Sequence, residues 1–164
     1  MDTKNRKIVL LYVVKRLSEQ LERPYFEGRK KLMKIMFLVE HFNPQKKTLH
    51  KNNLLGNKFV ICHYGPFSFD VRDSFDGLKK EGMVIEEPYM IPYKIGISNV
   101  GIKYLSENEK HIPKEIKERI EKIIDQFGLK DGNTLEKQSL KLLKISSEDK
   151  KELWGEDIKD LVRC

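Results

Sequence analysis

Two adjacent residues, Cys62 and His63, are the best candidates for chemistry in this sequence. They lie in the stretch "FVICHYGPFSFDV", residues 59–71. A cysteine beside a histidine suits a metal site or a nucleophile with its base. Successive side chains on a strand point to opposite faces, so the pair cannot reach one metal ion without a bulge. Because no other Cys/His pair has ligand spacing, we expect no metal site and no other cofactor.

The surroundings of this pair do not suit catalysis either. A nucleophile needs an orienting acid and an oxyanion-stabilising turn, but Gly65 precedes Pro66, which has no N–H to donate. The chain also shows no carboxylate pair, glycine-rich phosphate loop or nucleophile elbow. We expect no catalytic residue and no enzyme activity. The stretch is instead interpreted as a strand that turns at Gly65-Pro66 into a helix capped by Ser68.

The elements that position this stretch can be predicted from apolar spacing. Helical periodicity indicates one helix over 5–22 and a second over about 28–42. The segment 45–58 has weak periodicity and is predicted to be a loop with a short helical turn around Leu54. The β-rich run "KFVICHY", residues 58–64, is predicted to be a strand.

A helix, a hairpin and more helices are predicted to follow. In the helix that Ser68 begins and Gly82 ends, we expect one buried and one exposed set. The buried set is Phe69, Val71, Phe75 and Leu78, and the exposed set is Asp70, Asp73 and Asp76. Residues 83–97 are predicted to form a hairpin, and Ser98 to cap a helix. Pro113 is expected to open a helix with four isoleucines inward: Ile116, Ile120, Ile123 and Ile124. A last helix is predicted from Thr134 to about Leu143.

Two segments of this central region resemble winged-helix regulators. The run "FDGLKKEGMV" is similar to the end of their recognition helix and the first wing strand. The run "YKIGISNVGIKYL" is similar to their second wing strand and the next helix, with Ile97, Ser98, Gly101 and Leu105 in the matching places. The resemblance covers Phe69 to Leu105.

A second resemblance covers roughly Lys30 to Leu78. The helix "KKLMKIMFLVEHF" precedes the turn "YGPFS", as a "KLQKLLY"-like helix precedes "YGP" in the Panacea domain. Met33 stands where that family usually has glutamine. The Panacea domain is associated with antitoxins of toxin–antitoxin systems and with mobile genetic elements, so this resemblance implies an antitoxin-type interaction module.

Together these patterns predict an α+β, mostly helical fold in one domain, 1–164. We expect a winged-helix-like core over about 28–110 with a β-hairpin wing, plus additional N- and C-terminal helices. The C-terminal helical extension is expected over about 113–164.

The positive charge of the chain, a net +7, is concentrated at one end. Residues 1–60 contain 14 Lys and Arg against 5 Asp and Glu, whereas residues 61–164 contain 18 against 20. A localised positive face suits nucleic acid or an acidic protein, although it also fits a solvated lysine-rich surface. The candidate nucleic-acid-binding residues are Arg29, Lys30, Lys31, Lys34, Lys46, Lys47, Lys51, Arg72, Lys79 and Lys80.

Two functions therefore stay open. The first is a DNA-binding winged-helix transcriptional regulator whose partner is double-stranded DNA. Against it, the helix between Ser68 and Gly82 has a net charge of −1, and the wing sequence "EEPYMIP" offers no arginine. The second is a non-enzymatic interaction module of the antitoxin or mobile-element type with an acidic protein partner, for which Tyr89 and Tyr93 could be contact anchors.

The cysteines and the terminal helices bear on cellular location and assembly. Cys62 and Cys164 do not form a disulfide framework, which fits a reducing cytoplasm. The apolar run "IVLLYVV" stops at Lys15 and is too short to span a bilayer, so no membrane contact is expected. The terminal helices could pair two chains into a homodimer or pack within one chain, and periodicity alone does not distinguish the two.

Overall fold

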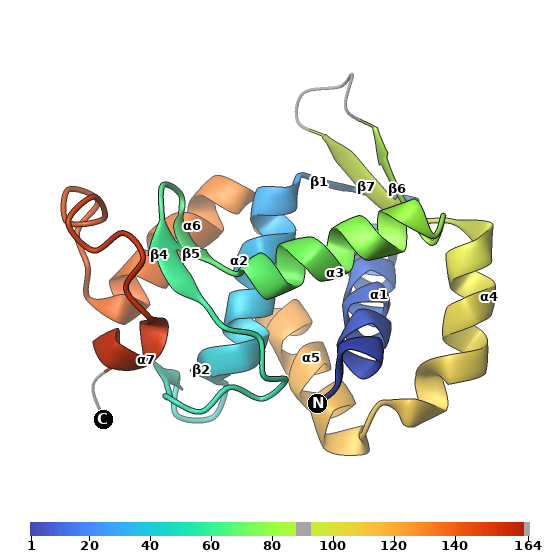
Figure 1. Cartoon of the computed structure of the whole chain (residues 1–164), viewed down its shortest axis with the longest axis horizontal. Helices are drawn as coiled ribbons and strands as arrows, with labels where there is room; N and C mark the ends of the chain where they lie inside the picture. The colour runs from blue at the N-terminus through green and yellow to red at the C-terminus, as the bar shows by residue number, and fades with distance from the viewer. Residues whose placement is uncertain (88–92, 163–164) are drawn as a thin grey trace.

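The first helix, α1 (Thr3–Gln20), lies at the centre of the fold (Figure 1). In the computed structural model, which describes residues 1–87 and 93–162, Asp2 caps this helix and almost all its apolar side chains are buried. α2 (Arg29–His41) is buried nearly as completely. The predicted helices over 5–22 and 28–42 are confirmed, and so is the mostly helical α+β class.

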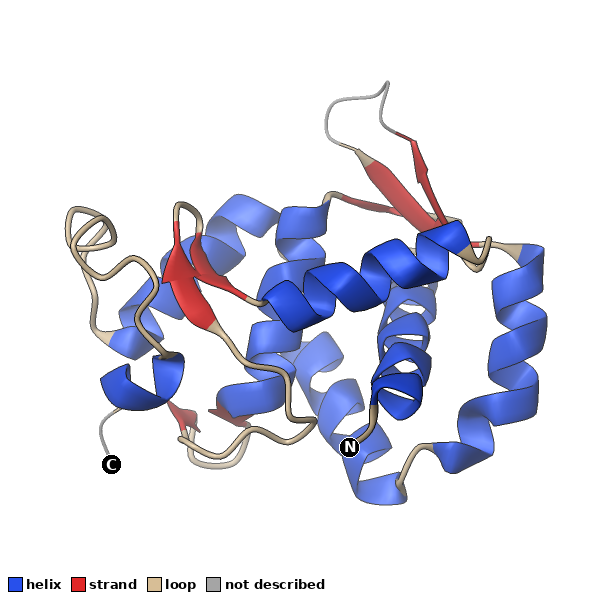
Figure 2. Ribbon diagram, in the orientation of Figure 1, coloured by secondary structure: helices blue, strands red, loops and turns tan. Residues whose placement is uncertain are grey.

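The largest sheet has three antiparallel strands in the order β1–β7–β6 (Figure 2). β6 (Val84–Glu87) and β7 (Lys94–Ile97) form the predicted hairpin, which projects from the helices. β1 (Phe26–Glu27) pairs with β7 and was not predicted. Tyr89 falls outside the described residues.

α3 (Phe69–Lys80) leads into this sheet. Ser68 caps it as predicted, because its side chain accepts the N–H of Val71, and Gly82 ends it with a positive φ of 75°. Val71, Phe75 and Leu78 are buried, but the prediction for Phe69 is wrong: its side chain is 51% exposed. Asp73 and Asp76 are exposed, whereas Asp70 is half-buried and accepts the backbone N–H of Lys58.

Two small hairpins separate α2 from α3. β2 (Phe42–Asn43) pairs with β3 (Thr48–Leu49), and β4 (Val60–Cys62) pairs with β5 (Gly65–Phe67). The predicted turn at Gly65-Pro66 is therefore wrong, because these residues belong to β5 and the chain reverses at His63 and Tyr64.

The predicted helical turn around Leu54 is also absent from this described part of the chain. Its place is taken by an irregular segment that is held by a buried carboxylate on α2. The two oxygens of Glu40 accept the backbone N–H groups of Leu55 and Asn57 at 2.8 and 3.0 Å. These bonds satisfy buried N–H groups that no helix or sheet pairs.

The remaining helices surround this centre. Ser98 caps α4 (Asn99–Asn108), and Gly101 lies so close to the Met83 carbonyl that a side chain there would clash. A short 3₁₀ turn, η1 (Glu109–His111), leads to α5 (Lys114–Phe127), α6 (Gly132–Leu143) and α7 (Ile158–Leu161). α5 buries its four isoleucines as predicted and packs on α1 and α2, while α6 packs on α2. None of these described helices is long and apolar enough to cross a membrane.

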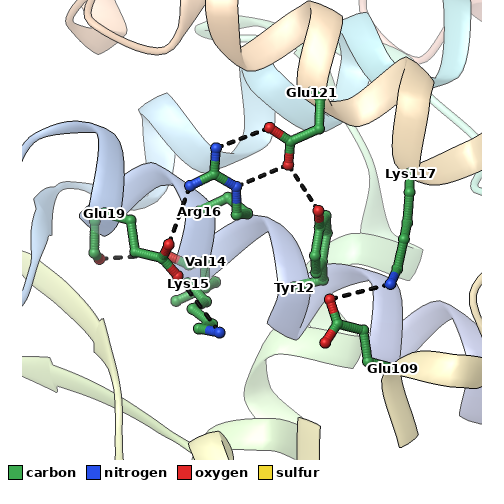
Figure 3. A network of polar contacts seen from close by, with 9 residues as sticks. Tyr12, Val14, Lys15, Arg16, Glu19, Glu109, Lys117 and Glu121 are labelled. Carbon is green, nitrogen blue, oxygen red and sulfur yellow. Dashed lines mark hydrogen bonds and ion pairs between the residues drawn. The ribbon is translucent and has the colours of Figure 1, made fainter. Parts of the chain in front are cut away.

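A polar network joins α1 to α5 (Figure 3). The Arg16 guanidinium forms two hydrogen bonds with the Glu121 carboxylate, at 2.7 and 2.8 Å, and Tyr12 donates its hydroxyl hydrogen to the same carboxylate at 2.7 Å. The hydrogen bond from Arg16 lowers the pKa of Glu121. This network fixes the register of two helices that are far apart in sequence.

Candidate functional site

A groove of about 650 Å³ lies between α2, α3 and the β4–β5 hairpin. Its walls carry apolar and aromatic side chains together with four cations, and no carboxylate lines it. The lining residues are Arg29, Lys30, Leu32, Met33, Lys34, Tyr64, Phe67, Val71, Arg72, Phe75 and Asn133. An apolar hollow with a few polar groups is the usual form of a binding site.

The two parts of the sequence that build the groove are held together by α2. The backbone N–H of Ser68 lies 3.3 Å from Met33 Sδ, which joins the start of α3 to α2. The next residue of α2, Lys34, donates a hydrogen bond from its ammonium to the Pro66 carbonyl at 2.8 Å. The helix "KLMKIMF" and the segment "YGPFS", which contains β5, therefore meet in space.

Lys34 is buried against the groove, with only 2% of its surface exposed. Burial lowers the pKa of its ammonium to about 7. Lysine is rarely this buried, and a buried cation costs folding free energy unless its donors are bonded.

The cations at the rim are already attached to neighbouring groups. The Arg29 guanidinium contacts Glu86 at 2.6 Å and Asp76 at 2.9 Å, and it also covers the Phe75 ring at 4.7 Å. Lys30 lies 4.6 Å from the centre of the Tyr64 ring. These contacts hold the long side chains in place, so the rim is organised before any partner arrives.

Exposed aromatic rings surround the groove. Tyr64 is 56% exposed and Phe69 is covered on one face by the Arg72 guanidinium at 4.8 Å. Beyond Tyr64, the His63 ring contacts both Tyr64 and Trp154, which is 53% exposed. Tyr, Trp and Arg are the residues that most often carry binding energy in protein interfaces.

The structure divides the ten predicted nucleic-acid-binding residues into separate groups. Lys31 and Lys34 are buried, and the Lys31 ammonium bonds the Gly128 carbonyl at the end of α5. Arg29, Lys30 and Arg72 line the groove, and Lys79 pairs with Glu86 at 3.0 Å. The remaining four are exposed: Lys46, Lys47, Lys51 and Lys80.

Cys62 and His63 do not form a chemical pair. Cys62 is half-buried at the end of β4, where burial raises the pKa of its thiol, and His63 is exposed on the turn. The part of the chain that the structure describes contains no group of three metal-ligating side chains. The stretch places the exposed Tyr64 ring and the half-buried Phe67 ring at the groove.

Sequence reasoning missed the groove itself. Phe69 was predicted to lie in the core, yet its ring contacts that of Phe67 edge to face at 5.0 Å beside the opening. The available signal was the density of aromatic residues in "CHYGPFSF" together with the adjacent basic helix.

The family described as Antitoxin SocA-like, Panacea domain, matches residues 32–142, about two thirds of the chain. The chain belongs to this family. A search of curated proteins finds no significant match. The Panacea resemblance is thereby confirmed, and the matched region includes most of the groove lining, from Leu32 to Asn133. The match favours the antitoxin-type module over a DNA-binding regulator, and the winged-helix resemblance stays a prediction.

Proposed function

We propose that this Panacea-family chain is a non-enzymatic, antitoxin-type module that binds an acidic partner protein through the groove between α2 and α3. The observation that carries this proposal is the composition of the groove: an apolar floor, four cations, exposed aromatic rings and no carboxylate in the lining. Such a surface attracts apolar side chains that lie beside acidic groups.

The arrangement of the rim supports partner binding in a second way. Tyr64 and Phe69 expose large rings that a folded chain would ordinarily bury, and each ring is held by a cation, Lys30 or Arg72. Rigid aromatic side chains lose little conformational entropy on binding. The rim therefore supplies contact area at low entropic cost.

A DNA-binding winged-helix regulator is the second candidate. In its favour, α1, β1, α2, α3, β6 and β7 follow in the order of a winged-helix core, with strand order β1–β7–β6 and a projecting hairpin. Against it, the outer face of α3 exposes Asp73 and Asp76, and Arg72 and Lys79 are already paired with carboxylates. A carboxylate-rich face repels the phosphates of a DNA groove. We therefore propose that the core serves protein recognition.

The folded domain extends, in our proposal, beyond the residues that the family model matches. α1 precedes the family match, yet it packs against α3, α4, α5 and β7. The segment after α6 returns to β4, where Ile158 donates its N–H to the Phe59 carbonyl at 3.0 Å. We propose that residues 1–162 fold as one unit.

The proposed function can be tested by toxin neutralisation. The chain is co-expressed with the toxin candidate encoded beside its gene, and growth and complex formation are measured. We expect the wild type to restore growth and the double variant Y64A/F69A to bind at least tenfold more weakly, because it removes two exposed rings from the rim. The matched control V100A/L129A removes two exposed apolar side chains elsewhere and should behave as wild type. Equal neutralisation by both variants would rule out the groove.

A further inference from the structure

Lys34 is the one lining residue of the groove that combines a charge with nearly complete burial. An ammonium group carries three N–H donors. Within the described residues, the Pro66 carbonyl at 2.8 Å is its hydrogen-bond acceptor, and no second one is found. The ammonium is therefore left with unused donors beside an apolar hollow.

The charged groups around Lys34 leave an excess of positive charge. Glu136 of α6 lies 3.1 Å from the Lys30 ammonium and 3.6 Å from that of Lys150. Glu136 acts to raise the pKa of Lys34, whereas Lys30 and Lys150 act to lower it. Cys62 of β4 also acts to raise the pKa of Lys34. Lys30 and Lys150 thus share one carboxylate, whereas Lys34 forms no ion pair with any described residue, so its ammonium is available to a second negative charge.

We propose that the Lys34 ammonium is the carboxylate-recognition group of the groove, and that the partner inserts an apolar side chain accompanied by an acidic group. This inference rests on the proposed function and specifies the chemistry of its partner. A carboxylate that reaches Lys34 would use the free donors and neutralise the buried charge, so the acidic group is recognised in a water-poor site where charge-assisted hydrogen bonds are strong.

The apolar floor and Lys34 then bind different parts of the partner. The apolar floor, with Leu32, Val71 and Phe75, binds the hydrophobic part of the segment. Lys34 selects for an anionic neighbour and against a neutral one. The carbonyl of a neutral group can accept a hydrogen bond, but it leaves the buried positive charge uncompensated, and its bond is weaker than that of a carboxylate.

A pair of matched small probes tests this proposal on the whole chain. Binding of 4-phenylbutyrate and of its neutral amide is followed by ¹H–¹⁵N NMR titration at pH 6 and pH 8. Since the pKa of Lys34 is about 7, the protonated fraction falls about tenfold between these pH values. We expect the affinity for the acid to fall about tenfold from pH 6 to pH 8, and the amide to bind more weakly at pH 6 without pH dependence.

Variants assign the effect to Lys34. Lys34→Met should bind the acid as weakly as the amide at both pH values. His63→Gln removes the imidazole beside Tyr64 and should keep the full pH dependence, as should Lys80→Met, which removes an exposed cation on α3. Equal binding of acid and amide, no binding of either, or pH dependence that survives in Lys34→Met each overturns the proposal.

The proposed function and the proposed role of Lys34 can be tested separately. If Y64A/F69A loses toxin neutralisation while Lys34→Met keeps it, the groove binds the partner without using Lys34, and only the present inference is wrong. If the probes behave as expected but Y64A/F69A still neutralises, the carboxylate site exists and the proposed function is wrong.

Discussion

The ammonium of Lys34 lies 2.8 Å from the carbonyl oxygen of Pro66, across 32 residues of sequence. This bond joins the two short motifs by which the chain resembles the Panacea family, one on α2 and one on β5. It also places a buried cation at the groove, where Met33 binds the start of α3. The family motifs are therefore the structural frame of the candidate site.

The first prediction concerns pH and the stability contribution of Lys34. Its pKa falls from 10.5 in the unfolded chain to about 7 in the fold, so the folded state binds fewer protons between these values. Stability from this group is present above pH 10.5 and is lost as the pH falls through 7. Between pH 7 and pH 9, the free energy of unfolding of the wild type should rise by about 2 kcal/mol relative to Lys34→Met.

Urea denaturation of both proteins at pH 7, 8 and 9 measures this difference. Lys80→Met is the control, because Lys80 is exposed on α3 and its replacement should leave the pH dependence of the wild type unchanged. A constant difference between wild type and Lys34→Met across this range would show that the ammonium is not buried as described.

The second prediction contrasts two phenylalanines of α3. Phe75 is 2% exposed, so Phe75→Ala should lower the free energy of unfolding by about 3 kcal/mol or more through lost burial and a cavity. Phe69→Ala should change it by less than about 0.5 kcal/mol, the usual range at exposed positions. Chemical denaturation measures both values. Similar losses in the two variants would place Phe69 in the core after all.

The exposure of Phe69 shows where sequence reasoning failed and why. Residues four and seven positions apart lie on one face of a helix, so Phe69 shares its face with the exposed Asp73 and Asp76. Val71, only two residues away, points to the opposite side and is buried. The periodic rule was sound, but Phe69 was counted with the wrong stripe because of its residue type.

Regular elements with strong local signals were predictable. The isoleucine stripe of α5 and the caps at Ser68 and Ser98 depend on residues within one or two turns, and the structure confirms them.

The elements that were missed depend on contacts distant in sequence. β1 has two residues and exists only by pairing with β7, and the segment near Leu55 follows the buried carboxylate of Glu40. The groove arises in the same way, since Lys34 and Pro66 reveal their contact only after folding. Local periodicity carries no information on such pairs.

The third prediction concerns the network between α1 and α5. Glu121→Gln removes the negative charge that accepts two hydrogen bonds from Arg16 and one from Tyr12, so it should lower the free energy of unfolding by about 1 kcal/mol, reduced by partial exposure. Glu118→Gln on the same helix loses only an exposed ion pair of 3.9 Å with Lys114 and should have less than half this effect. Thermal and urea denaturation compare the two.

The pH dependence of this network has a defined direction. Because the hydrogen bond from Arg16 lowers the pKa of Glu121, its stabilisation is present above the unfolded pKa and is lost as the pH falls through the folded value. Glu121→Gln should therefore lose less stability than the wild type below about pH 4.5. Equal acid sensitivity of the two proteins would contradict the network.

The last prediction concerns whether this chain binds DNA. Lys46, Lys47 and Lys51 are exposed and form no ion pair with any described residue, so they are the members of the predicted basic set best able to contact phosphates. We expect duplex binding to be weak, independent of sequence and strongly reduced by salt. Neutralising all three lysines with glutamine should reduce the slope of log K against log salt by up to about 3, at about 0.9 for each phosphate contact. Sequence preference should instead depend on Arg72, Lys79 and Lys80 of α3, because only contacts in the grooves of DNA specify sequence.

Fluorescence anisotropy over a range of salt, with the wild type and both triple variants, measures these quantities. Absence of binding even at low salt would remove the regulator from consideration and leave the interaction module. Tight binding to one duplex that is lost on neutralising Arg72, Lys79 and Lys80 would make the DNA-binding regulator the better-supported function. In that case α3 would read the DNA groove while Asp73 and Asp76 lie outside it.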